Sequence, residues 1–224
     1  MPSVGVRDID GNYDGPNIAN SGVNYNPVAA ALQRNNILER QRLMANVYGD
    51  VTLTKGLVFK SEISFDNNHS LAKAFHPTFK WGSIVNNENR LRQREENNFF
   101  WAAKNYLTYD KSFGNHKFTV LLGQEANDSH WEGVIASAQG FKTNSVHTLN
   151  LADVDNNTVT QYKGSSSLSS LFARIIYDFN SKYSITASTR QDVSSKFDPT
   201  TENQKGVFNA VSGSWKLSNE EFME

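Results

Sequence analysis

Apolar and polar residues alternate along most of the chain. Between Arg42 and Leu53 the odd positions are mostly apolar and the even positions are mostly polar or charged. A period of two is typical of a β-strand with one apolar face. The pattern predicts about seven strands, near residues 42–53, 57–66, 96–110, 117–131, 170–179, 183–192 and 207–217. Only residues 27–40, which begin at a proline, have a pattern compatible with a helix.

The connections between these strands alternate in length. Short turns are predicted near 55–56, 111–116 and 180–182, whereas long polar loops are predicted near 67–95 and 137–167. In an antiparallel up-and-down sheet this order places the tight turns on one rim and the long loops on the other. Transmembrane β-barrels have such short and long rims. The sequence therefore predicts an all-β, antiparallel sheet that is part of a large barrel and is not closed by this chain alone.

The polar side of the predicted strands carries full charges, and the other side has almost none. A water-filled lumen opposite a lipid surface requires this segregation, but a soluble β-sandwich with one wet face produces it as well. Tyrosine and phenylalanine gather beside the short turns, as in the aromatic girdle of a membrane protein. We expect the lumen-facing polar residues to include Glu62, Lys104, Arg174, Arg190 and Asp192.

Composition excludes several classes of function. The chain has 224 residues, a formal net charge of −1 and no cysteine, so neither a nucleic-acid partner nor a thiolate metal site is expected. Mean hydropathy is −0.55, and no apolar run reaches the roughly 18 residues of a spanning helix. The first 15 residues lack the pattern of a signal peptide.

Candidate chemistry is sparse. The five histidines are scattered without metal-ligand spacing, and the acidic run from Asp8 to Asp14 departs from a calcium loop at the glycine and glutamate positions. No nucleophile or acid–base pair stands out, so we expect no enzyme, no metal and no cofactor. Trp81 and Trp131 lie in or near the predicted long loops, where indole rings could contact a sugar or a peptide or simply pack the loops.

Several segments carry a family resemblance, in order and over nearly the whole chain. They read NPVAAALQRNN at 26–36, TLTKGLVFKSEISFD at 52–66, KNYLTYDKSFGNHKFTVLLGQE at 104–125, YKGSSSLSSLFARIIYDFNSKYSITASTRQD at 162–192 and GSWKLSNEEFM at 213–223. Together they resemble the β-barrel of SusC/RagA-type TonB-dependent transporters from the outer membrane of Bacteroidota. The resemblance implies an internal fragment, since large barrels of this kind close 22 strands around a plugged lumen.

The resemblance also implies a function and partners. A transporter of this type imports glycan oligomers or peptides across the outer membrane, with a SusD-like surface lipoprotein on the long-loop rim and the TonB complex acting through a plug that this chain lacks. The domain division expected is a loop-rich segment at 1–40, a barrel segment at 41–217 and a truncated end at 218–224. The alternative is a soluble or surface-attached β-sandwich that binds carbohydrate.

Overall fold

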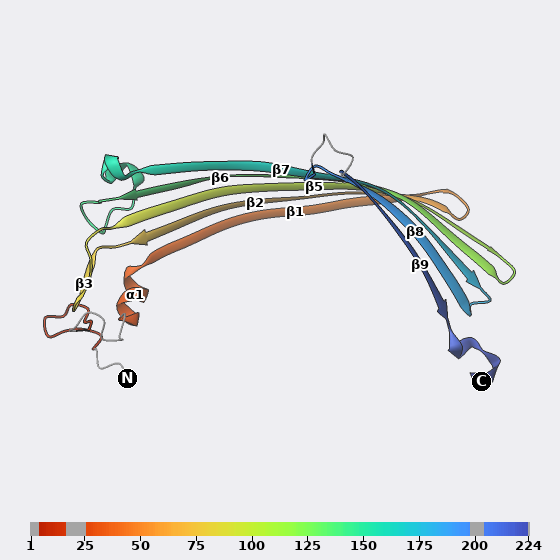
Figure 1. Cartoon of the computed structure of the whole chain (residues 1–224), viewed down its shortest axis with the longest axis horizontal. Helices are drawn as coiled ribbons and strands as arrows, with labels where there is room; N and C mark the ends of the chain where they lie inside the picture. The colour runs from red at the N-terminus through yellow and green to blue at the C-terminus, as the bar shows by residue number, and fades with distance from the viewer. Residues whose placement is uncertain (1–4, 17–25, 198–203, 224) are drawn as a thin grey trace. The chain divides into compact units, whose positions relative to one another are not determined.

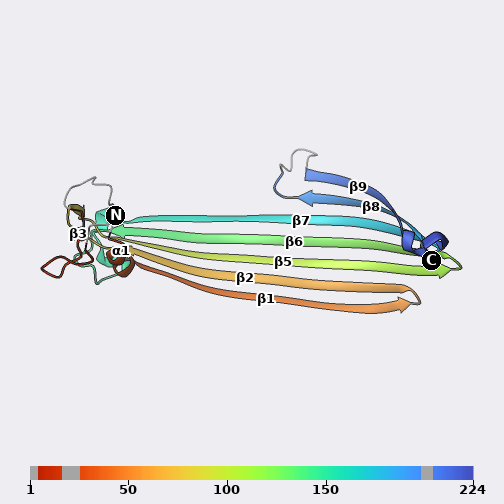
Figure 2. The same cartoon turned by 90° about the horizontal axis from the view of Figure 1, so that it is seen from below.

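The computed structural model, which describes residues 5–16, 26–197 and 204–223, confirms the predicted antiparallel sheet. Seven strands lie side by side in the order β1-β2-β5-β6-β7-β8-β9, so every long strand pairs with its neighbour along the chain (Figures 1 and 2). Strands β3 (Phe79–Trp81) and β4 (Ile84–Asn86) form a separate hairpin within one connection. Within the described residues the sheet has two free edges, at β1 and β9, and is not closed.

Five of the seven strands are much longer than predicted. The strands are β1 (Asn35–Thr54), β2 (Leu57–His76), β5 (Arg90–Phe113), β6 (His116–Gln139), β7 (Thr158–Phe179), β8 (Tyr183–Ser194) and β9 (Lys205–Trp215). The loop predicted at 67–95 was therefore mostly wrong, because most of it is strand. The loop predicted at 137–167 was too long, since only 140–157 lies between β6 and β7. A tilted membrane-spanning strand needs about 9–11 residues, so strands of 20 to 24 residues exceed one span.

The chain divides into two compact units, and the five long strands contribute to both. The first unit contains 1–41, 68–97 and 132–163, and the second contains 42–67, 98–131 and 164–224. The second unit holds the segments with clear apolar–polar alternation, and the first holds the polar extensions of the strands and the long connections. No helix within the described residues is long and apolar enough to cross a membrane.

The three short turns of the second unit lie at one end of the strands. The backbone N–H of Asp110, beside the β5–β6 turn, donates to the carbonyl of Gly56 in the β1–β2 turn at 2.8 Å. The N–H of Asn180 in the β7–β8 turn donates to Asn115 at 2.7 Å. These bonds join successive turns directly, which confirms the predicted rim of tight turns.

The two long connections of the first unit are also joined to each other. They are residues 77–89, between β2 and β5, and 140–157, between β6 and β7. Asn89 is 2% exposed; its Nδ2 donates to the carbonyl of Phe141 at 3.0 Å, and its Oδ1 accepts from the N–H of Phe141 at 2.7 Å. A small core of Phe75, Leu91, Ala138, Phe141 and Ala152 lies beneath them.

The N-terminal segment is held by one buried asparagine. Asn26 caps helix α1 (Pro27–Gln33), because its Oδ1 accepts from the N–H groups of Val28 and Ala29. Its Nδ2 donates to the carbonyls of Val6 and Asp14, both at 3.0 Å. The helix predicted for 27–40 is therefore shorter than expected, since β1 begins at Asn35.

Candidate functional site

Strand register in the second unit separates two chemically different faces. Ile175 lies opposite Ala187, which lies opposite Val211, and these residues define the apolar face. Arg174 lies opposite Ser188, and Arg190 lies two pairs further along, opposite Phe172, so these residues define the polar face. On the apolar face Ile175, Ile185 and Val211 are 49%, 55% and 79% exposed. A large exposed aliphatic surface of this kind requires a covering partner or lipid.

The aromatic residues near the turns lie together on the apolar face. The Phe118 ring lies 4.7 Å from Tyr177 and 5.7 Å from Phe113 between centroids, and the Tyr183 and Trp215 rings lie 6.2 Å apart. Rings with an apolar body and a polar edge favour a membrane–water boundary. Their position beside the short turns matches the predicted girdle.

Arg190 is the centre of a charged network on the polar face. Its Nε donates to Asp192 at 2.6 Å, and its Nη2 donates to Ser170 at 2.8 Å and to Glu125 at 3.3 Å. The Cζ atom of its guanidinium also lies 5.2 Å from the centroid of the Phe172 ring, within the roughly 6 Å of a cation–π contact. Three strands thus contribute to one fixed guanidinium.

Arg174 and Arg190 line one hollow of about 460 Å³, with Tyr106, Glu125 and Phe172. Of the predicted polar residues, the structure therefore brings together Arg174, Arg190 and Asp192. Lys104 shares the strand parity of Tyr106 on β5 but does not line the hollow. Glu62 lies on β2, where it accepts from Asn46 at 3.2 Å and lies 4.0 Å from Lys60.

Gly123 makes room for this network, and sequence reasoning missed it. A Cβ atom at position 123 would lie 2.2 Å from Cε2 of Phe172, so only glycine lets that ring lie flat against β6. The Phe172 ring in turn supports Arg190. The glycine within an otherwise alternating strand was the available signal, because such a glycine often marks a close approach.

We expect Gly123→Ala to destabilise the second unit by about 1–3 kcal/mol, the usual cost of overpacking. The measurement is the midpoint temperature at which the full-length protein unfolds in detergent. Unfolding is detected on a gel as the loss of the faster-migrating, heat-modifiable form. Gly213→Ala is the matched control, because a Cβ there meets only Ser184 O at 3.8 Å. Equal shifts for the two variants would contradict the close packing of Phe172 on Gly123.

Trp131 lies within β6 rather than in a loop. The strand continues for eight residues beyond it, to Gln139. A Cβ atom at Gly164 would lie 2.5 Å from Cζ2 of Trp131, so the indole lies over the β7 backbone. Trp131 has the parity of Gly123 and Glu125, which places it on the polar face, and it is 37% exposed.

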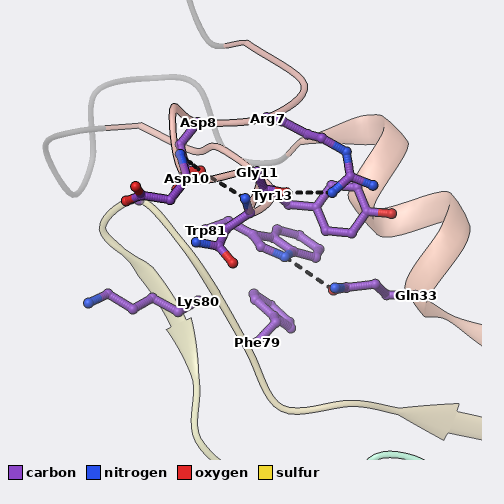
Figure 3. Close-up of a pocket in the computed structure, with 11 residues that line it drawn as sticks. Arg7, Asp8, Asp10, Gly11, Tyr13, Gln33, Phe79, Lys80 and Trp81 are labelled. Carbon is purple, nitrogen blue, oxygen red and sulfur yellow. Dashed lines mark hydrogen bonds between the residues drawn. The ribbon is translucent and has the colours of Figure 1, made fainter.

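Trp81 lies in β3 and is buried, with 3% exposure. Its Nε1 donates to Gln33 Oε1 at 3.1 Å, and its ring stacks on Phe79 with centroids 3.9 Å apart (Figure 3). It lines a pocket of about 740 Å³ in the first unit, together with Arg7 and Tyr13 of the N-terminal segment. The structure thus gives this indole a packing role in the pocket wall.

The acidic run beside that pocket stabilises its own turn. The Oδ1 atom of Asp8 accepts from the backbone N–H of Asp10 at 3.0 Å and of Asn12 at 2.8 Å. The Arg7 guanidinium lies 4.7 Å above the Tyr13 ring and donates to the carbonyl of Gly11. The bonds of Asp8 are therefore local, and its carboxylate caps the turn in which it lies.

A further cluster lies at the short-turn end, around Glu220. Its carboxylate accepts from Lys182 Nζ at 2.9 Å, from Trp215 Nε1 at 2.9 Å and from the Tyr183 hydroxyl at 2.8 Å. These donors, Lys182 first, lower the pKa of Glu220 from 4.5 to about 2. The bonds fasten the segment after β9 to the β7–β8 turn.

Because the pKa of Glu220 is lowered in the folded protein, its stabilising bonds are fully present above pH 4.5 and are lost as the pH falls towards 2. We expect the fluorescence of Trp215 to change in this acid window, with the signal isolated by subtracting the Trp215→Phe variant. Glu220→Gln should remove the transition. A transition that persists in Glu220→Gln would assign it to another group.

No protein-family model matches the chain. The TonB-dependent receptors P39 and P3 of Formosa agariphila are 34% identical over 231 residues and 31% identical over 229 residues; each match takes in 100% of this chain, but only 21% and 22% of the relative. The TonB-dependent receptor SusC of Bacteroides thetaiotaomicron is 29% identical over 119 residues, which are 53% of this chain and 11% of SusC.

The chain is homologous to TonB-dependent receptors of the SusC/RagA type. The solved structure of the RagAB peptide transporter has the same fold, with a TM-score of 0.83 at 20% identity over 96% of this chain and 24% of that chain. The chain thus spans about a fifth to a quarter of the length of its TonB-dependent relatives. These relatives are named receptors and transporters, which agrees with the prediction that the chain is not an enzyme.

Proposed function

We propose that this chain is part of the barrel wall of an outer-membrane transporter that imports glycan oligomers or peptides. The observation that carries the proposal is the separation of faces in the second unit. The apolar face exposes Ile175, Ile185 and Val211, while the polar face holds the Arg190 network. A wall between lipid and a water-filled passage needs both faces on the same strands.

In this proposal the polar face lines the passage. Glu62, Lys104, Arg174, Arg190 and Asp192 then face the lumen. Trp131 is proposed as a substrate contact because its indole is partly exposed on that face, and indole rings stack on flat sugar or peptide surfaces. Trp81 is proposed to contribute through the wall of the pocket in Figure 3, since its own ring is buried.

The partners follow from the same proposal. The long connections 77–89 and 140–157 form the rim on which a SusD-like surface lipoprotein would dock. The TonB complex would act through a plug supplied by another part of the protein. Residues 41–217 remain the proposed barrel segment, although β1 already begins at Asn35.

The alternative, a soluble β-sandwich that binds carbohydrate, needs a second sheet to cover the apolar face. Among the described residues the second unit offers no such sheet. The similarity to TonB-dependent receptors also favours the transporter.

A gene deletion tests the proposal. Loss of the full-length gene that encodes this chain should abolish growth on one class of oligosaccharide or peptide, screened as sole nutrient, and the wild-type gene should restore it. The full-length protein should fractionate with the outer membrane and co-purify with a lipoprotein. Normal growth on every nutrient tested, or recovery in the soluble fraction, would overturn the proposal.

A further inference from the structure

Three arginines follow one another on one face of β5. Arg90, Arg92 and Arg94 stand two residues apart, so they point to the same side of the strand at intervals of about 6.6 Å. The first unit thus presents a row of guanidinium groups on one side of β5.

A hollow of about 340 Å³ lies beside this row in the first unit, lined by Arg92 and Arg94. Its other walls include Asn36 and Leu38 of β1, and Ala72 and Ala74 of β2. The two alanines are the physical cause of the hollow, because methyl groups on β2 leave space between the longer side chains of β1 and β5.

The three arginines differ in how far their charges are already satisfied. Arg90 donates twice to Gln139 Oε1, at 2.9 and 2.7 Å. Arg94 is bonded to Glu96 and to the Tyr162 hydroxyl, which in turn donates to Glu96 at 2.8 Å. Arg92 has no hydrogen bond or ion pair within the described residues. Its guanidinium is exposed and lies between two fixed neighbours of the same charge.

We propose that this hollow is an anion subsite that binds a carboxylate or sulfate group of an imported oligosaccharide. Arginine presents a planar fork of donors that matches such groups in a bidentate manner. A bound anion would relieve the repulsion between Arg92 and its neighbours, while Leu38 and the alanines would receive the apolar face of a sugar ring. This inference rests on the proposed function, since the hollow must open on the transport path.

The lining favours a charged glycan over an acidic peptide. A peptide main chain brings an N–H and a C=O at each residue, and both need partners when they leave water. Two of the three strands that line the hollow, β2 and β5, are interior strands whose backbone groups are paired on both sides within the sheet. Asn36 is the sole side-chain amide among the lining residues. Guanidinium groups beside the aliphatic side chains of Leu38, Ala72 and Ala74 suit a sugar ring that carries an acidic substituent.

The test measures binding to the full-length protein in detergent by isothermal titration calorimetry. The probes are hexagalacturonate, a chondroitin sulfate hexasaccharide, neutral maltohexaose and hexaglutamate. We expect the wild type to prefer at least one anionic glycan, and Arg92→Gln to weaken that binding about tenfold or more. Arg92→Lys keeps the charge without the fork and should recover only part of the affinity.

Lys55→Gln is the control, because it also removes a positive charge, while Lys55 is exposed in the β1–β2 turn and is not among the residues that line the hollow. It should leave the anionic preference unchanged. Absence of any anionic preference in the wild type, equal losses in the two glutamine variants, or tightest binding of hexaglutamate would overturn the glycan subsite. The proposed function is tested separately by gel heat-modifiability. A wild-type protein that does not insert into the membrane would contradict the proposed function, whatever the binding result.

Discussion

Arginine at position 175 is expected to abolish assembly of the full-length protein in the outer membrane. Ile175 lies on the apolar face, opposite Ala187, and is half exposed. If that face meets lipid, as proposed, an arginine near the bilayer midplane costs about 2–4 kcal/mol. The measurement is the yield of the heat-modifiable, membrane-inserted form on a semi-native gel.

The matched control is Ile176→Arg, the same substitution one residue further along. Ile176 lies opposite Thr186, on the face of Arg174 and Arg190. An arginine there remains in water and should leave assembly close to normal, as should Arg174→Ala. Equal tolerance of arginine at positions 175 and 176 would contradict the assignment of the apolar face to lipid.

The sequence pattern predicted the sheet because one face of each strand in the second unit is apolar. Leu171, Ala173, Ile175 and Tyr177 alternate with polar or charged residues, apart from Phe172 and Ile176. The register confirms that these odd positions share a face. Short turns were equally visible; Asn180 and Ser181, which both adopt positive φ, mark the β7–β8 turn.

The outer parts of the strands could not be predicted in this way. From Asn67 to Ser70 the chain reads Asn-Asn-His-Ser, which is polar on both sides, yet it is continuous β2. A strand with water on both faces has no reason to alternate, so the period-two signal stops while hydrogen bonding continues. The same cause hid the arginine row, because 90–94 lay in a predicted loop.

The alternation of odd and even positions along each strand identified the candidate polar residues, but it could not identify their hydrogen-bond partners. The Arg190–Glu125 pair joins residues 65 positions apart, on strands β8 and β6. Their contact depends on the stagger of three strands and on the space left by Gly123. The burial of Trp81 likewise depends on the β3–β4 hairpin and on the hydrogen bond to Gln33 of α1. Neither feature produces a periodic pattern in the sequence, so neither could be predicted from one.

Removal of the Asn89 side chain is expected to open the long connections of the first unit without unfolding the strands. Asn89→Ala leaves both the N–H and the carbonyl of Phe141 without their side-chain partners. Each buried polar group left unpaired costs about 1–3 kcal/mol. Residues 140–157 should therefore exchange their amide hydrogens much faster, by roughly tenfold or more, in hydrogen-exchange mass spectrometry of the full-length protein.

Asn87→Ala is the control, because Asn87 lies in the same connection but is exposed. Exchange in 170–192, which belongs to the second unit, should be unchanged in both variants, because β7–β8 pairing does not involve the connections. If a SusD-like partner docks on this rim, Asn89→Ala should also reduce its co-purification while heat-modifiability persists. Faster exchange throughout 170–192 would instead show that the connections stabilise the sheet itself, and the division between a supporting wall and a binding rim would be wrong.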